Sequence, residues 1–247
     1  MKASLHPFYC LVLTTLGCAA LLVGCQAPGK PGPAEERPEQ VTDFTHLYKQ
    51  NCAACHGENG QHGLAVSLNN PAYIAIAGEE AIRRATAQGG PGKLMPAFAR
   101  QFGGTLTDRQ VEILAAGIVQ RWGRPRDFTG LTPPPYATTL SGNAEAGKVF
   151  YAGTCARCHD AVLKGTGPVT DSAYLALISD QGLRTAILSG HAEEGMPDWR
   201  NIAATPLTDQ QVTDIVAWLA SQRKTPEPAM PAVSTAPIVA TKEKSHE

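Results

Sequence analysis

Two short stretches decide how this sequence folds: Cys52-Ala53-Ala54-Cys55-His56 and Cys155-Ala156-Arg157-Cys158-His159. They are two copies of one pattern, and the similarity continues beyond them at a constant offset of 101 positions. A constant offset over a long stretch indicates an internal duplication and therefore two domains. The matched segments are Tyr73 with Tyr174, Gly89 with Gly190, Met95-Pro96 with Met196-Pro197, and Leu106-Thr107-Asp108 with Leu207-Thr208-Asp209.

The periodicity around the two motifs predicts helices and no strands. Thr107 and Thr208 each precede Asp and a run with apolar residues at helical spacing, which indicates an N-cap and an amphipathic helix. Gly89 and Gly190 suit the ends of the preceding helices. The expected fold is all-α, with opening helices over 42–50 and 143–152, second helices over 79–88 and 180–189, and last helices after 107 and 208.

Composition narrows the class of protein. Charged residues make up 17% of the chain and the net charge is -1, which argues against nucleic-acid binding. Hydrophobic residues make up 43%, enough to build cores, so a wholly disordered chain is excluded.

Stretches rich in proline and glycine separate the predicted domains. We expect a signal peptide and a tether before the first domain, a linker carrying three consecutive prolines between the domains, and a disordered tail. The predicted boundaries are 1–24 for the signal, 25–41 for the tether, 42–125 for the first domain, 126–142 for the linker, 143–224 for the second domain and 225–247 for the tail.

The amino terminus has the pattern of an export signal. Lys2 precedes an apolar run that is too short for a typical membrane span. The run ends in Leu22-Val23-Gly24-Cys25, which resembles the lipobox of bacterial lipoproteins. That resemblance implies cleavage before Cys25, lipidation of Cys25, and a membrane-anchored protein in the bacterial periplasm. The alternative is an uncleaved anchor with an incidental cysteine.

Cys-x-x-Cys-His predicts covalent attachment of c-type haem. Residues i, i+3 and i+4 share one helix face, so both thiols and the imidazole address one ligand. Cys52, Cys55, Cys155 and Cys158 would then hold two haems, with His56 and His159 as iron ligands. A thioredoxin-type redox pair and half of a zinc site are the alternatives. A redox pair does not need a histidine directly after the second cysteine, and a zinc site would need the cysteine pairs of the two domains to be brought together across the proline-rich linker.

Met95 and Met196 are the predicted sixth ligands. They occupy equivalent positions, and the proline after each one disfavours helix there. A thioether ligand favours ferrous iron and closes the site to small molecules. The alternative is that both methionines only fill core space. His62 and His191 are rival ligands; each lacks a counterpart in the other repeat, so we expect both to face solvent.

Together these motifs resemble a dihaem class I cytochrome c over residues 42–224. The resemblance implies two covalently bound haem c groups and two small domains whose first and last helices cross. Gly147 and Phe150 resemble the residues of that crossing, with Trp218 as the aromatic partner. The first repeat has threonine at position 45 and offers Tyr48, so a looser crossing is expected there. Further candidates, as hydrogen-bond donors to haem propionates or as packing residues, are Tyr73, Tyr174, Arg83 and Arg184.

The expected function is single-electron transport by a tethered periplasmic dihaem cytochrome, rather than enzymatic catalysis. Its expected partners are a quinol-oxidising complex or dehydrogenase upstream and an oxidase or reductase downstream. The alternative is a dihaem redox enzyme of the peroxidase or thiosulfate dehydrogenase type, which would need one haem with an open or unusual ligand position.

Overall fold

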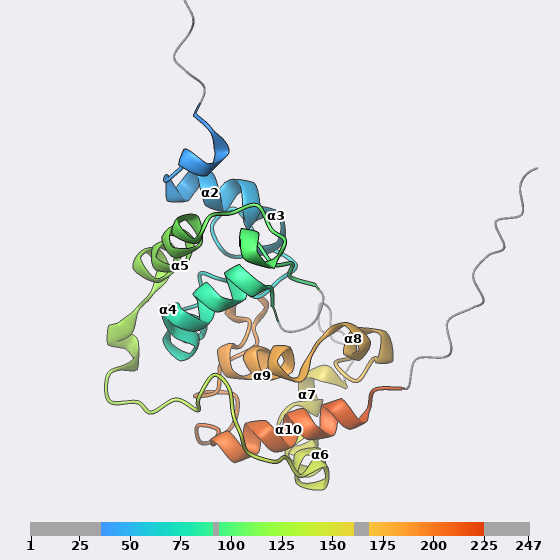
Figure 1. Cartoon of the computed structure of the whole chain (residues 1–247). Helices are drawn as coiled ribbons and strands as arrows, with labels where there is room; N and C mark the ends of the chain where they lie inside the picture. The colour runs from blue at the N-terminus through green and yellow to red at the C-terminus, as the bar shows by residue number, and fades with distance from the viewer. Residues whose placement is uncertain (1–35, 91–93, 161–167, 225–247) are drawn as a thin grey trace, which may run out of the picture. The chain divides into compact units, whose positions relative to one another are not determined.

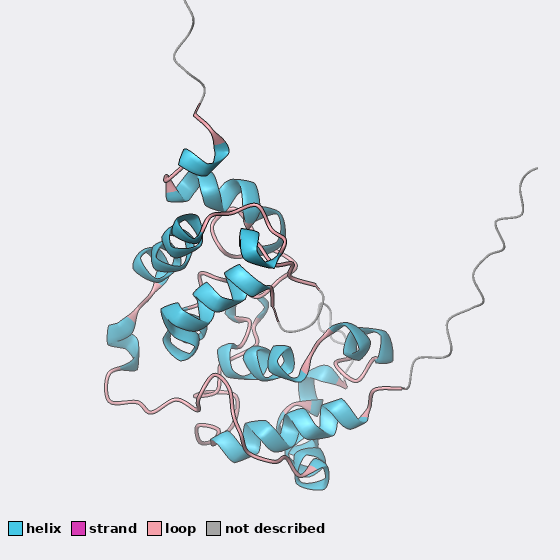
Figure 2. Ribbon diagram, viewed as in Figure 1, coloured by secondary structure: helices cyan, strands magenta, loops and turns pink. Residues whose placement is uncertain are grey.

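The computed structural model describes residues 36–90, 94–160 and 168–224, and every regular element within them is helical (Figures 1 and 2). The only β-type pairings in this part of the chain are two isolated bridges, Ala99 with Leu106 and His191 with Met196. The predicted all-α class is therefore confirmed. The signal, Cys25 and the tail lie outside the described residues. The described residues from Thr42 onward form one compact unit, and the contacts between the two repeats described below lie inside it. None of the described helices is long and apolar enough to cross a membrane.

The first repeat consists of α2 (Phe44–Asn51), α3 (Ala53–His56), α4 (Pro71–Gln88) and α5 (Asp108–Trp122). Helix α4 begins eight residues before the helix predicted over 79–88. Asn70 caps it and Pro71 occupies its first turn, a favoured place for proline. Gly78, with φ 68° and ψ 167°, interrupts its helical backbone.

The second repeat follows the same order with α6 (Ala144–Thr154), α7 (Ala156–His159), α8 (Ser172–Leu177), α9 (Asp180–Ser189) and α10 (Asp209–Ser221). Helices α8 and α9 correspond to the two parts of α4, and the prediction for 180–189 is confirmed. Ser179 stands where the first repeat has Gly78, and its side chain caps α9 by accepting from Gly182 N at 3.1 Å.

The last helix of each repeat begins at its predicted cap. The Thr107 hydroxyl accepts from Gln110 N and the Thr208 hydroxyl from Gln211 N, both at 3.2 Å. Each glutamine side chain returns a bond to the threonine backbone, completing a capping box. These caps fix the start of the helices that cross the opening helix of each repeat.

In both repeats a glycine lets the first and last helices approach closely where they cross. It lies on the last helix in the first repeat and on the first helix in the second repeat. In the second repeat Gly147 of α6 lies under α10, where a Cβ would stand 1.9 Å from Asp214 O. In the first repeat Gly117 of α5 lies under Phe44, where a Cβ would stand 2.1 Å from the Phe44 ring. The positions equivalent to Gly147 and Trp218 are Phe44 and Gly117, so the glycine and the aromatic residue have exchanged helices.

This corrects one detail of the predicted crossing. Tyr151, not Phe150, packs on Trp218, with ring centroids 4.2 Å apart. The looser crossing expected in the first repeat is confirmed, because α2 packs on α5 over a much smaller contact than α6 on α10; its one close approach is that of Gly117 to Phe44. Tyr48 packs edge-on against Trp122 there, with centroids 5.3 Å apart.

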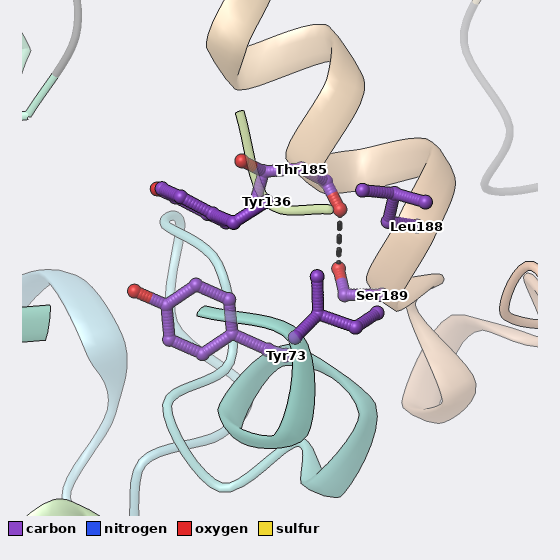
Figure 3. A pocket seen from close by; sticks show the side chains of 6 residues that line it. Tyr73, Tyr136, Thr185, Leu188 and Ser189 are labelled. Carbon is purple, nitrogen blue, oxygen red and sulfur yellow. Dashed lines mark hydrogen bonds between the residues drawn. The ribbon is translucent and has the colours of Figure 1, made fainter. Parts of the chain in front are cut away.

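The linker is bonded to the second repeat through Arg184. This side chain is 3% exposed, and its guanidinium donates to Pro135 O and Tyr136 O and pairs with Asp209. Tyr136 faces α9 and α4 across a crevice too small for water, with Tyr73 on its other wall (Figure 3). The crevice is completed by Ile76, Thr185, Leu188 and Ser189.

Candidate haem sites

A cavity of about 590 Å³ lies in the second repeat, within the range of about 300–1,000 Å³ typical of cofactor pockets. Cys155, His159 and Met196 all line it, so the structure brings together three of the four residues predicted for this site. Cys158 is exposed on the same short helix, α7. The apolar wall comes from α9 and α10 and consists of Leu183, Ala186, Ile187, Ile215 and Leu219.

His159 carries the polar atom that the surrounding protein leaves open. Its Nδ1 is buried and has no hydrogen-bond partner among the described residues. Burying an imidazole nitrogen without a partner is costly. In the first repeat the equivalent nitrogen of His56 lies 2.8 Å from Val66 O, so Nε2 is the nitrogen left for a metal. Residues 161–167, which follow this helix, lie outside the described part of the chain.

The loop that carries Met196 is closed by two backbone hydrogen bonds between Met196 and His191. Met196 O accepts from His191 N at 2.9 Å, and Met196 N donates to His191 O at 3.0 Å. The loop leaves α9 at Gly190, whose φ of 63° takes the chain sharply out of the helix. A Cβ on Gly190 would stand 2.6 Å from Met196 O, so this close return needs glycine.

The first repeat has the same loop construction. Met95 O accepts from Gly90 N at 3.1 Å, and Gly89 with φ 91° ends α4. A Cβ on Gly89 would stand 2.8 Å from Met95 O. The two predicted methionines thus occupy equivalent loops, although residues 91–93 between Gly90 and Met95 are outside the described chain.

His56 is fixed in one tautomer. Its Nδ1 lies 2.8 Å from Val66 O, and a carbonyl can only accept, so Nδ1 carries the proton. The lone pair of Nε2 is then available to a metal, the arrangement found for most ligating histidines. The ring is 6% exposed, and this burial lowers its pKa, which favours the neutral, ligating form.

The cysteines of both motifs are thiols of which one in each pair is partly buried. No disulfide joins the four cysteines of the described residues. Burial, with a smaller contribution from Cys55, raises the pKa of Cys52 to about 12; burial raises that of Cys155 to about 11. Both thiols therefore stay protonated at neutral pH. Cys55 and Cys158 are the exposed members of each pair.

The chain matches a family of known proteins twice. The sequence model of cytochrome c oxidase, cbb3-type, subunit III fits residues 39–116 and again residues 142–219. The chain belongs to this family of c-type cytochromes. Its two tandem cytochrome c domains imply two covalently bound haem c groups and a function in haem-based electron transfer. The four cysteines named above fit the attachment motifs.

This cytochrome can also be compared with solved structures and with curated proteins. One solved chain, from the Kuenenia stuttgartiensis reducing HAO-like protein complex, aligns with 79% of this chain and 100% of its own length. The sequence identity is 19% and the TM-score is 0.45. No curated protein matches.

The residues present fit haem c. The second cavity is lined by the thiol of Cys155, the imidazole of His159, the thioether of Met196 and an apolar wall, with Cys158 exposed on the adjacent α7, which is a combination suited to a haem pocket. In the first repeat the equivalent residues are Cys52, Cys55, His56 and Met95, which stand at the equivalent positions of α3 and of the loop after α4. Among the described residues, no group of three His, Cys, Asp or Glu side chains is placed to hold a bare metal ion.

One residue of this cytochrome was placed wrongly from the sequence. His191 does not simply face solvent: it is partly buried and lines the second cavity together with Met196. The absence of a histidine in the first repeat, where Gly90 stands, gave no sign of this. His62 is exposed as expected, with a positive φ of 61°. Glu194 and Asp171 also line the second cavity, and nothing in their sequence context had pointed to them.

The four residues considered as hydrogen-bond donors to haem propionates lie in different surroundings in the two repeats. Tyr174 lines the second cavity, whereas Tyr73 lies in the crevice beside the linker. Arg184 binds the linker carbonyls and Asp209, and Arg83 pairs with Glu80 on the exposed side of α4. Equivalence in the repeat therefore did not give equivalent roles to these side chains.

Proposed function

We propose that this cytochrome is a lipid-anchored periplasmic carrier that passes single electrons between respiratory partners through two haems with His/Met ligation. His56 and Met95 would ligate the first iron, and His159 and Met196 the second. The observation that carries the proposal is that His159 and Met196, distant in the sequence, line one cavity with Cys155.

Each residue of the second site has a distinct task in this proposal. When bound, the haem supplies an iron that holds or releases one electron. The thioethers from Cys155 and Cys158 would fix the ring, the imidazole of His159 would donate its lone pair, and the thioether of Met196 would favour the ferrous form. The apolar wall around them excludes water and so disfavours the extra charge of the ferric form.

The proposed location and partners rest on sequence and family. Cys25, the proposed lipid site, is followed by a proline-rich stretch suited to an extended tether. The partners would be a quinol-oxidising complex or dehydrogenase upstream and an oxidase or reductase downstream. The family takes its name from an oxidase subunit, which supports a terminal oxidase among the downstream partners. Cys25→Ala should release the protein from the membrane fraction after cell lysis.

Near-infrared magnetic circular dichroism of the ferric protein tests the ligation, because the methionine-to-iron charge-transfer band identifies His/Met haem. Wild type should show this band for both haems, and Met95→Ala and Met196→Ala should each remove one haem's share. His191→Ala is the control for the rival ligand and should keep both. A high-spin or bis-histidine haem in wild type would contradict the assignment and favour the dihaem enzyme.

A further inference from the structure

Asn70 uses both ends of its amide, one in each repeat. Its Oδ1 caps α4 by accepting from Ala72 N at 2.9 Å and Tyr73 N at 3.2 Å. Its Nδ2 donates to Ser189 O at 2.9 Å and, more weakly, to Gly190 O at 3.4 Å. The residue is 8% exposed. The carbonyls it contacts stand at the end of α9, where the chain turns into the loop that carries Met196.

The equivalent residue of the second repeat separates these two tasks. Asp171 caps α8 by accepting from Ala173 N and Tyr174 N, both at 2.9 Å, in the same geometry as Asn70. A carboxylate therefore suffices for the cap. The NH₂ group of Asn70 is not needed to start its helix, and its described bonds are to the second repeat.

A second side chain of the first repeat holds the same loop. The hydroxyl of Ser67, which is 4% exposed, donates to the carboxylate of Glu193. Glu193 belongs to the short 3-10 helix Ala192–Glu194, which lies between the two residues of the loop's own bridge, His191 and Met196. Ser67 and Asn70 thus form hydrogen bonds to the loop that carries Met196, Ser67 at its middle and Asn70 at its start.

We propose that Asn70 and Ser67 are positioning residues for the second haem: the first domain holds the loop that presents Met196 to the iron of the second domain. This rests on the proposed ligation by Met196. The effect runs from the first repeat to the second: side chains of the first repeat determine how firmly the second haem iron keeps Met196 as its sixth ligand. A loosened loop gives up the thioether more readily to an added ligand.

Imidazole binding to the full-length ferric protein measures this directly. In a Met95→Ala background the remaining methionine-to-iron band belongs to the second haem alone, so its loss during a titration reports only that site. Asn70→Asp keeps the cap, as Asp171 shows, but removes the donor and turns a carboxylate toward two carbonyls. Asn69→Asp is the matched control: it adds the same charge one position away and breaks a bond to Asn59 O inside the first repeat.

Asn70→Asp should raise the imidazole binding constant of the second haem about tenfold, the effect of losing roughly one to two hydrogen bonds. Ser67→Ala should raise it by a smaller factor, and Asn69→Asp should leave it unchanged. In a Met196→Ala background, Asn70→Asp should not alter imidazole binding at the first haem.

Two kinds of failure are distinguishable. If the band in the Met95→Ala background does not depend on Met196, the proposed ligation fails. If the band depends on Met196 but Asn70→Asp and Ser67→Ala bind imidazole like Asn69→Asp, the ligation stands and the positioning role is overturned. Far-ultraviolet circular dichroism of each variant verifies that α4 is intact.

Discussion

At the scale of single residues, the two repeats place equivalent side chains in different surroundings. Tyr73 is 6% exposed in the crevice beside the linker, whereas Tyr174 is 38% exposed at the second haem cavity. The difference arises because α4 packs against α9 of the other repeat, while α8 lies beside its own haem site.

Tyr73 should make the protein sensitive to alkali. Burial raises its pKa above the usual value of 10.0, so the folded protein keeps this phenol neutral. Above pH 10 the unfolded chain releases that proton while the folded chain retains it, and stability falls as pH rises. Tyr73→Phe should therefore lose less unfolding free energy than wild type between about pH 9 and about pH 11. Urea unfolding at several pH values measures this, and equal slopes would contradict it.

The sequence predicted that Cys155, His159 and Met196 come together better than it predicted which side chains surround them. The cysteines and histidines stand in a fixed local spacing, and each methionine was marked by the proline after it and by its equivalent in the other repeat. His191 and Arg184 were different, because their roles depend on which segment packs against them. His191 lines a cavity with Met196 and Arg184 binds linker carbonyls, contacts that no local pattern contains.

At the scale of helices, turn chemistry made the boundaries predictable. The Thr208 cap and the Gly190 end were visible in the sequence, and the helix over 180–189 was recovered whole. The early start of α4 was missed because Gly78 breaks the apolar periodicity, although the chain continues into a second helical segment.

Two glycines of α6 should respond to alanine in opposite directions. At Gly147 a Cβ would meet the backbone of α10, which cannot move aside, so Gly147→Ala should destabilise the protein by about 2–3 kcal/mol or more. At Gly153 a Cβ meets nothing within 4 Å, so Gly153→Ala should stabilise it by about 0.5–1 kcal/mol. Chemical denaturation of the haem-loaded protein compares them; similar values for both would show that the crossing is not close-packed.

At the scale of the whole molecule, Arg184 connects the linker to the second repeat. Arg184→Ala would remove the ion pair with Asp209 and the donors to Pro135 O, while Asp209 keeps Thr138 and Tyr136 O keeps Gln181, and it should cost about 2–3 kcal/mol of stability. Arg83→Ala at the equivalent position removes only an exposed pair with Glu80 and should leave the melting temperature almost unchanged. Thermal unfolding of both variants checks this, and equal losses would argue against the linker contact.

The exchanged glycine has a consequence for the history and engineering of the chain. Because one repeat puts its small residue on the opening helix and the other on the closing helix, the two halves are no longer interchangeable parts. A chimera that placed α6 against α5 would put Gly147 where Phe44 packs on Gly117 and leave that space empty, and one that placed α2 against α10 would put Phe44 where only a glycine fits against the Asp214 backbone and collide. Gene conversion between the duplicated halves is therefore penalised unless both crossing helices move together.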